Sequence, residues 1–183
     1  MSFSLILLAA GKSNRFKSKV PKPYHKLGGK TLLEISLSKF RQFKEIKKIA
    51  VVINKNHKKY LSSTKIKNIK IIHGGNSRSK STFNALKFFI KHKKTKKVLI
   101  HDAARPNFSS KLIKRIISNS NKFHAVIPIL KIQDALKEKR NNCFYNKKRD
   151  NFFITQTPQL FNLKQIFNLH KLEENRYNDD DLS

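Results

Sequence analysis

Cysteine and long apolar runs are nearly missing from this sequence, and each shortage excludes a class of protein. Cys143 is the only cysteine, which excludes a disulfide framework and a cysteine-based metal site and fits a reducing compartment. The apolar run Phe3–Ala10 is far shorter than the roughly 20 residues that span a bilayer. It is also too short for the core of a secretory signal, and no Lys or Arg precedes it. We therefore expect a cytoplasmic protein without a membrane partner.

Glycine and proline are scarce as well, with five residues each, and they form no linker. No internal repeat is present. The length of 183 residues suits one domain, and a hydrophobic content of 38% is enough for a core. We expect a single domain over residues 1–183.

Acidic residues are the third shortage, because 11 Asp and Glu stand against 41 Lys and Arg, a net charge of +30. Such a charge first suggests nucleic acid, since clustered basic residues bind phosphates by releasing counterions. However, Lys supplies 33 of the 41, and Asn and Ile are also abundant, a profile that A/T-rich codons produce without selection for binding. The basic residues are not interleaved with a nucleic-acid motif. We expect a solvated basic surface rather than a nucleic-acid partner.

Apolar segments alternate between strand-like and helix-like spacing along the chain. Helical spacing recurs over residues 32–40, 83–90 and 112–117, the first with Thr31 as a possible N-cap and Glu34 three residues later. Continuous apolar runs predict strands at Phe3–Ala9, Ile49–Ile53, Ile69–Ile72, Val98–Ile100 and Ala125–Leu130. Continuous runs favour a parallel sheet covered on both faces. With right-handed crossovers, the pattern predicts a doubly wound, mostly parallel, Rossmann-like α/β sheet.

The pattern changes after Leu130. Residues 131–150 are polar and predict an excursion from the sheet, either a β-arm or a long loop. The chain is expected to re-enter the sheet at Phe152–Thr155 and to end in a helix near Leu163–Leu172.

Four polar segments follow predicted strands. Ligands bind outside the carboxyl ends of parallel strands, so we expect all four segments at one edge. In the first, AAGKSNRF, the small residues Ala9, Ala10 and Gly11 would let the backbone approach a phosphate closely. Arg15 and Lys22 add positive charge to the same loop. The alternative is an ordinary strand-to-helix connection.

The other three segments each allow two interpretations. In GGNSRSKS, Gly74 and Gly75 at a helix start favour an anion or base-edge site made by backbone N–H groups, although Ser77 or Ser79 could be a simple N-cap. In HDAARP, Asp102 is placed for a metal ion or a ribose hydroxyl, or for an ion pair with its neighbour Arg105. His101 is interpreted as an orienting or core residue, because no second His stands at ligand spacing. The segment TQTPQ (155–159) suits hydrogen bonding to a polar substrate, or is a plain turn.

Taken together, these segments resemble the 2-C-methyl-D-erythritol 4-phosphate cytidylyltransferases of the non-mevalonate isoprenoid pathway, over essentially the whole chain. The matching segments are AAGKSNRF with PKPY, GGNSRSKS, HDAARP and, after Arg149, QTPQLF. HDAARP and QTPQ are specific to this family and a close ribitol-phosphate relative, and Ala104 favours the methylerythritol enzyme. The resemblance implies a nucleotidyltransferase sheet with a dimerisation arm and a reaction between CTP and the sugar-alcohol phosphate. Transfer to ribitol 5-phosphate and non-catalytic nucleic-acid binding are the alternatives.

The resemblance also implies roles for individual residues. Arg15 and Lys22 match the catalytic residues that stabilise the transition state. Asp102 matches an acid beside the Mg²⁺ that accompanies the triphosphate. The substrate-side positions are Arg105, Arg149 and Thr157, and Arg149 would reach the neighbouring subunit of a homodimer if residues 131–150 are the arm. The CTP-binding positions are Ala9, Ala10, Gly11, Gly74, Gly75, Ser81 and Asp102.

The sequence departs from the family pattern at three places. Ala135 follows Asp134 where the family has Asp-Thr, so one hydroxyl contact to the substrate is missing. Asn76 follows the glycine pair where an acid is usual. Residues 178–183 resemble the segment that opens the family's last helix, so we expect the family's final strand and helix, with a further Lys and acid, to be absent.

Overall fold

The computed structural model describes residues 2–11, 13, 16–61, 69–92 and 95–180. Arg15, one of the two predicted catalytic residues, lies outside the described residues. Among the described residues, no helix combines the length and the apolar content needed to cross a bilayer.

Six strands form the central sheet, in the order β5–β4–β1–β6–β12–β7. They are β1 (Phe3–Ala9), β4 (Ile46–Ile53), β5 (Lys70–His73), β6 (Lys97–Asp102), β7 (Ala125–Val126) and β12 (Gln159–Asn162). Strand β1 pairs in parallel with β4 and β6, and β4 pairs in parallel with β5. Strand β12 is antiparallel to both β6 and β7. The chain winds outward from β1 to β5 and then returns to β6, which confirms the predicted mostly parallel, doubly wound α/β class.

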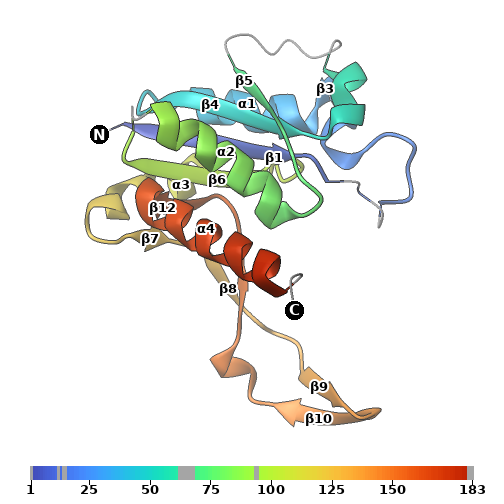
Figure 1. Cartoon of the computed structure of the whole chain (residues 1–183). Helices are drawn as coiled ribbons and strands as arrows, with labels where there is room; N and C mark the ends of the chain where they lie inside the picture. Colours follow the sequence, from blue (N-terminus) through green and yellow to red (C-terminus); the bar gives the residue numbers. More distant parts are fainter. Residues whose placement is uncertain (1, 12, 14–15, 62–68, 93–94, 181–183) are drawn as a thin grey trace.

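Helices cover both faces of the sheet (Figure 1). They are α1 (Leu32–Arg41), α2 (Arg78–His92), α3 (Ser110–Ser118) and α4 (Leu163–Asp180). Leu5 of β1 packs in one core cluster with Phe40 of α1 and Ile113 of α3. The next residue, Ile6, packs in the other cluster with α2 and α4. Alternate side chains of one strand thus enter different cores, which explains why the parallel strands are apolar without interruption.

Short elements complete the body. A tight hairpin joins β2 (Lys26–Leu27) to β3 (Lys30–Thr31) through Gly28 and Gly29, both with positive φ. The 3₁₀ turns that lie within the described residues include η2 (Lys22–Tyr24), η3 (Lys55–Tyr60), η4 (Asn119–Asn121) and η5 (Arg149–Asn151).

Helix α1 begins with the predicted capping box. The Thr31 hydroxyl accepts a hydrogen bond from the Glu34 backbone N–H at 3.2 Å. The Thr31 backbone N–H donates in turn to Glu34 Oε2 at 2.7 Å. Two N–H groups that the helix itself leaves unpaired are therefore satisfied, and the predicted helix start is confirmed.

The excursion over residues 131–150 is a β-hairpin arm. Strands β9 (Leu136–Arg140) and β10 (Cys143–Lys147) pair antiparallel, and Asn141 and Asn142 between them have positive φ, as a tight hairpin turn requires. Figure 1 shows this hairpin standing away from the sheet. The predicted β-arm is confirmed.

Two strand predictions around the arm are wrong. The predicted strand Ala125–Leu130 is divided into β7 and β8 (Ile129–Lys131), because the chain leaves the sheet near Pro128. The apolar residues of β11 (Phe153–Thr155) do not re-enter the sheet but pair with β8 outside it, where Phe153 and Ile154 remain about half exposed. The strand that re-enters is β12, whose Leu160 is fully buried.

Candidate functional site

Three of the four predicted segments meet where parallel strands end. The backbone N–H of Ala103, just after β6, donates to the carbonyl of Leu8 in β1 at 3.0 Å. On the other side of β1, the N–H of Gly74 donates to the carbonyl of Ile53 at the end of β4, at 2.8 Å. Together with the pairing of Ala9 and Ile53 in β1 and β4, these hydrogen bonds bring the AAG, GGNSRSKS and HDAARP segments to one edge.

The fourth segment reaches the same edge from the opposite direction. It was expected to follow a parallel strand, but Thr157 precedes the antiparallel strand β12, so the start of β12 rather than its end lies at this edge. The Thr157 hydroxyl lies 2.9 Å from Nδ1 of His101 and accepts a hydrogen bond from the Asp102 N–H at 3.4 Å. The position was predicted correctly for the wrong topological reason.

The glycine pair is packed rather than open. A Cβ on Gly74 would lie 2.6 Å from Cβ of Ala10 and 2.8 Å from Oγ of Ser81, so the first and second segments are in close contact there. The Gly74 N–H is bonded to Ile53, and the Gly75 N–H donates to Ser81 Oγ at 3.1 Å. Both N–H groups are therefore engaged within the chain, and the anion or base-edge site at this segment stays a prediction.

The serines after the glycines have separate tasks. Oγ of Ser77 accepts from the Lys80 N–H at 3.0 Å, which confirms the N-cap interpretation for Ser77. Ser79 turns away from the cap and contacts α4. At the end of β1, Gly11 is exposed, and a Cβ there would meet no atom within 4 Å.

Asp102 holds two arginines. Its Oδ1 lies 3.2 Å from both Nε and Nη2 of Arg78, and its Oδ2 lies 3.0 Å from Nε of Arg105. Arg105 also donates to Oε1 of Gln156 at 3.0 Å. The ion-pair interpretation of Asp102 and Arg105 is confirmed, and the pair connects the HDAARP and TQTPQ segments.

Arg78 was missed in the sequence analysis. It occupies the first turn of α2, and its half-exposed guanidinium places a second positive charge on Asp102. The signal was available, because Arg78 lies inside the GGNSRSKS segment. Its partner Asp102 lies on another strand, however, and the spacing along the chain does not reveal that pairing.

His101 is a fully buried structural residue, as predicted. Its Nδ1 faces the Thr157 hydroxyl, and its Nε2 lies 3.1 Å from the carbonyl oxygen of Arg105. Burial lowers the pKa of His101 to about 4, although the neighbouring Asp102 acts in the opposite direction. The imidazole is therefore neutral near pH 7 and fixes the loop that carries Asp102 and Arg105.

Lys22 lies at the start of η2 with an exposed side chain. Its backbone N–H donates to Oγ of Ser13 at 2.9 Å, and its Nζ lies 5.9 Å from the centroid of the Phe16 ring. Two residues later, the Tyr24 hydroxyl donates to the carbonyl oxygen of Ala9 at 3.4 Å. Lys22 is thus anchored next to the end of β1 while its ammonium group stays in solvent.

Arg149 lies apart from the other candidate residues of the same chain. It begins η5 beside the arm, and its guanidinium donates to the carbonyl oxygen of Gln133. Among the described residues, it forms no hydrogen bond or ion pair with the residues gathered around Asp102.

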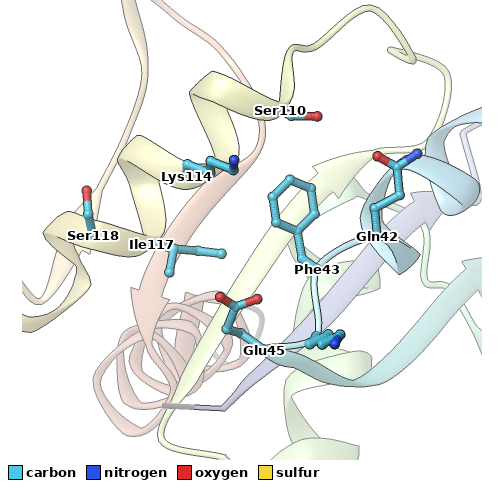
Figure 2. Close-up of a pocket in the computed structure, with 8 residues that line it drawn as sticks. Gln42, Phe43, Glu45, Ser110, Lys114, Ile117 and Ser118 are labelled. Atoms are coloured by element: carbon cyan, nitrogen blue, oxygen red, sulfur yellow. The ribbon is translucent and has the colours of Figure 1, made fainter.

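Two hollows on the surface lie away from this edge. A cavity of about 620 Å³ lies between the α1–β4 connection and α3, and Phe43 and Ile117 point into it (Figure 2). A second, of about 540 Å³, lies beside the arm and includes Arg149 in its lining. Neither is lined by Lys22, Gly74 or Asp102. The candidate site is therefore defined by the contacts between the four segments rather than by either of these two hollows.

The comparisons with known proteins agree with this geometry. Residues 3–183 match the family model described as IspD: 2-C-methyl-D-erythritol 4-phosphate cytidylyltransferase. The chain belongs to this family. It is therefore a transferase of the nucleotidyltransferase class, on an α/β fold that the family shares.

Individual relatives give the extent of the match. The bifunctional enzyme IspD/IspF of Pelagibacter ubique is 44% identical over 98% of this chain and 48% of its own length. The 2-C-methyl-D-erythritol 4-phosphate cytidylyltransferase of Wigglesworthia glossinidia brevipalpis is 40% identical over 92% of this chain and 74% of its own. The solved synthase of Anaerococcus prevotii is 32% identical, with a TM-score of 0.77, over 94% of this chain and 74% of that one. The chain thus spans about half of the bifunctional relative and about three quarters of the others.

Proposed function

We propose that this chain transfers the cytidylyl group of CTP to 2-C-methyl-D-erythritol 4-phosphate and releases pyrophosphate. The observation that carries the proposal is the convergence of the AAG, GGNSRSKS, HDAARP and TQTPQ segments on one edge of the sheet. Lys22, Arg78 and Arg105 give this edge the positive charge that two phosphate-bearing substrates require.

In this reaction a phosphate oxygen of the sugar alcohol forms a bond to the α-phosphorus of CTP, and the bond from that phosphorus to the bridging oxygen breaks. Negative charge grows on the α-phosphoryl oxygens and on the leaving pyrophosphate. The protein contributes chiefly position and positive charge, because such a transfer gives it little covalent work. We assign the charge stabilisation to Lys22 and Arg15.

The nucleotide would lie against the ends of β1 and β4. Because Gly74 has no side chain, the backbone of its loop can lie close to Ala10 at the end of β1. Ser81 accepts a hydrogen bond from the Gly75 N–H, so the loop presents a defined surface to the base. Ala9, Ala10 and Gly11 keep the start of the phosphate loop free of bulk. Arg105 and Thr157, on the β6 and β12 side, would receive the alcohol phosphate.

Asp102 is the residue suited to a divalent cation. Mg²⁺ usually takes one or two protein carboxylates and fills its other positions with water and substrate phosphate, and Asp102 fits that donor set. Among the described residues, no group of three or more His, Cys, Asp or Glu side chains could form a protein-only cage. When bound with CTP, Mg²⁺ would offset charge on the triphosphate. Asp102 would then give up its contacts with Arg78 and Arg105 and face the cation instead.

The proposal is tested by pyrophosphate release from the full chain. Release is expected with CTP and 2-C-methyl-D-erythritol 4-phosphate together, to depend on Mg²⁺, and to fall at least 100-fold in Lys22→Ala, the order expected when a charge on the transition state is removed. Ribitol 5-phosphate in place of the methylerythritol substrate separates the close relative. Failure of the wild-type chain to release pyrophosphate with CTP and the methylerythritol substrate would refute the proposal.

We further propose that two copies associate through the arm and the strands at its base. Large apolar side chains are 47–67% exposed there: Ile129, Leu130, Phe144, Tyr145, Phe153 and Ile154. So many exposed large apolar side chains in one part of the chain are unusual on a monomer, and a second copy would cover them. The arm would then carry Arg149 to the other subunit's Asp102 edge.

Mixing two inactive variants tests this arrangement. In a dimer of Lys22→Ala with Arg149→Ala, one site contains both defects, and the other is intact if Arg149 acts across subunits. Random mixing should then restore about a quarter of the wild-type activity, as the symmetry of a two-fold dimer dictates. No recovery after verified exchange of subunits would show that Arg149 acts within its own chain.

A further inference from the structure

Helix α4 is fastened to the first turn of α2 by a polar cluster outside the residues assigned so far. Oγ of Ser79 lies 3.0 Å from Nδ1 of His170 and donates to Oε2 of Glu173 at 2.9 Å. Nδ1 of His170 lies 3.6 Å from the same carboxylate oxygen. The three side chains therefore form a closed triangle between the two helices.

The single proton of the Ser79 hydroxyl fixes the direction of these bonds. Because that proton goes to Glu173, the bond between Ser79 and His170 must be donated by the histidine through Nδ1–H. Burial lowers the pKa of His170, so the neutral ring prevails near pH 7. The tautomer with its proton on Nδ1 satisfies every member of the triangle.

Apolar and charged contacts hold the triangle in place. The His170 ring stacks on Phe83 of α2 at a centroid distance of 6.1 Å, and Phe167 lies 5.4 Å from the same Phe83 ring. One turn along, Glu174 forms ion pairs with Lys80 and, at 3.5 Å, with Lys87. The two helices thus meet through these polar and ionic contacts as well as through the apolar side chains of their shared core cluster.

The part of α2 held in this way is the part that faces the nucleotide edge. Arg78, the residue before Ser79, binds Asp102, and Ser81, two residues after it, holds the Gly75 N–H. Ser79 lies between these two contacts on the first turn of the helix. A displacement of that turn would move the glycine loop and the Arg78 guanidinium together.

We propose that Ser79, His170 and Glu173 are positioning residues for nucleotide binding, through which α4 sets the place of the Gly74–Gly75 loop. The inference rests on the proposed function, because it takes that loop as the CTP-binding surface. It gives a role in nucleotide binding to α4, a helix that lies outside the four segments singled out from the sequence.

Four variants of the full chain test it. Ser79→Ala removes the centre of the triangle, and His170→Ala removes the Nδ1–H donor. His170→Asn keeps an N–H donor at nearly the same place and serves as the conservative rescue. Lys171→Ala changes the exposed neighbouring residue on α4 and serves as the matched control.

Two readouts are measured for each variant. The first is hydrogen exchange of peptides over residues 74–81, which needs neither substrate nor activity. The second is the KM for CTP against the KM for the alcohol phosphate, with the dissociation constant for CTP measured by calorimetry as well. We expect Ser79→Ala and His170→Ala to speed exchange over residues 74–81 and to weaken CTP binding about 3- to 10-fold, the equivalent of one or two hydrogen bonds. The KM for the alcohol phosphate should stay unchanged, and His170→Asn and Lys171→Ala should resemble wild type.

The inference is overturned if exchange over residues 74–81 stays at the wild-type rate, or if both KM values rise together. It is also overturned if exchange quickens while the affinity for CTP does not change. If the wild-type chain binds CTP without turnover, the calorimetric constant still decides the inference, whereas the proposed reaction fails. The two failures are therefore distinguishable.

Discussion

Gly74 leaves no room for a side chain, and this makes it a sensitive small residue of the site. A methyl group there would press on Ala10 and Ser81 at 2.6 and 2.8 Å, with Val52 close behind at 3.4 Å. The constraint comes from the chain's own packing, since Gly74 does not have the positive φ seen at Gly28 and Gly29.

We predict that Gly74→Ala lowers stability by about 1–3 kcal/mol, the usual cost of overpacking. For a chain of this size the melting temperature should fall by roughly 3–10 °C. Thermal unfolding followed by circular dichroism measures the change. Gly11→Ala is the control for stability, because its added methyl group meets open space. Equal melting temperatures for the two variants would contradict the packing argument.

His57 is a second sensitive residue, buried beneath the start of the site. Its ring lies 5.5 Å from Tyr24, and its Nδ1 has no hydrogen-bond partner among the described residues. Burial lowers the pKa of His57 and outweighs an interaction with the Ala9 backbone that raises it. A base whose pKa is lower in the folded state takes up more protons when unfolded, so acid favours unfolding.

We therefore predict that wild-type stability declines as the pH falls below about 6.5, the ordinary histidine value, and that His57→Phe declines less. Urea unfolding at pH 7.5 and pH 5.5 measures both. The same substitution at the exposed His124 is the control and should follow wild type. If wild type and His57→Phe lose the same free energy of unfolding between pH 7.5 and pH 5.5, His57 does not contribute to the pH dependence of stability.

Among the elements, α1 shows how local sequence signals decide a helix start. Thr31 and Glu34 exchange two hydrogen bonds at its first turn, and the two residues lie only three positions apart in the sequence. We predict that Thr31→Ala costs about 1 kcal/mol, as the loss of an N-cap does. Ser38→Ala, in the same helix, should cost less than about 0.5 kcal/mol. Urea unfolding of both variants at pH 7.5 gives the difference, and equal losses would refute the role of the cap.

The elements that could be predicted correctly from the sequence are those determined by signals within a short stretch of residues. Strand β1 and the start of α1 follow from an unbroken apolar run and from a capping pair. Strands β11 and β12 were misassigned because their environment depends on the arm. Phe153 and Ile154 are apolar but cover no core, whereas Leu160, in the short segment Gln159–Asn162, is fully buried and pairs with Leu99 of β6.

The features of the candidate site also fall into those that could be predicted from the sequence and those that could not. The AAG, GGNSRSKS and HDAARP segments could be placed on one edge from strand order alone. The pairing of Arg78 with Asp102, and of Thr157 with His101, joins residues on different elements and could not be predicted from spacing. The engagement of the Gly74 and Gly75 N–H groups likewise depends on Ile53 and Ser81.

For the whole molecule, the net charge of +30 matters more for how substrates arrive than for the fold. Both proposed substrates are anions, and salt screens their attraction to the surface. We predict that kcat/KM for CTP falls about 3- to 10-fold between 50 and 500 mM KCl. Sucrose at matched osmolality is the control and should have little effect. A value of kcat/KM that does not depend on salt would show that the surrounding lysines play no part in capture.

The same charge makes a prediction about nucleic acid. Without a dedicated motif, binding to a short DNA duplex should be weak, with a Kd of about 10⁻⁶ M or higher at 150 mM salt, the range of non-specific complexes. Fluorescence anisotropy measures it. Nanomolar binding at that salt would favour the nucleic-acid hypothesis over a solvated basic surface.

Strand β12 has a consequence for how the molecule folds. Gln159 pairs with Ile100 only after α3, the arm and the β8–β11 pair have been synthesised and brought back to the sheet. All the parallel strands precede β12 in the chain, so their pairings can form during synthesis before β12 is available. The contact of Thr157 with His101 should therefore be among the last to form. The edge of β6 where the substrates are proposed to meet is thus completed late in assembly, and a nascent chain that has made every parallel strand still lacks one side of its site.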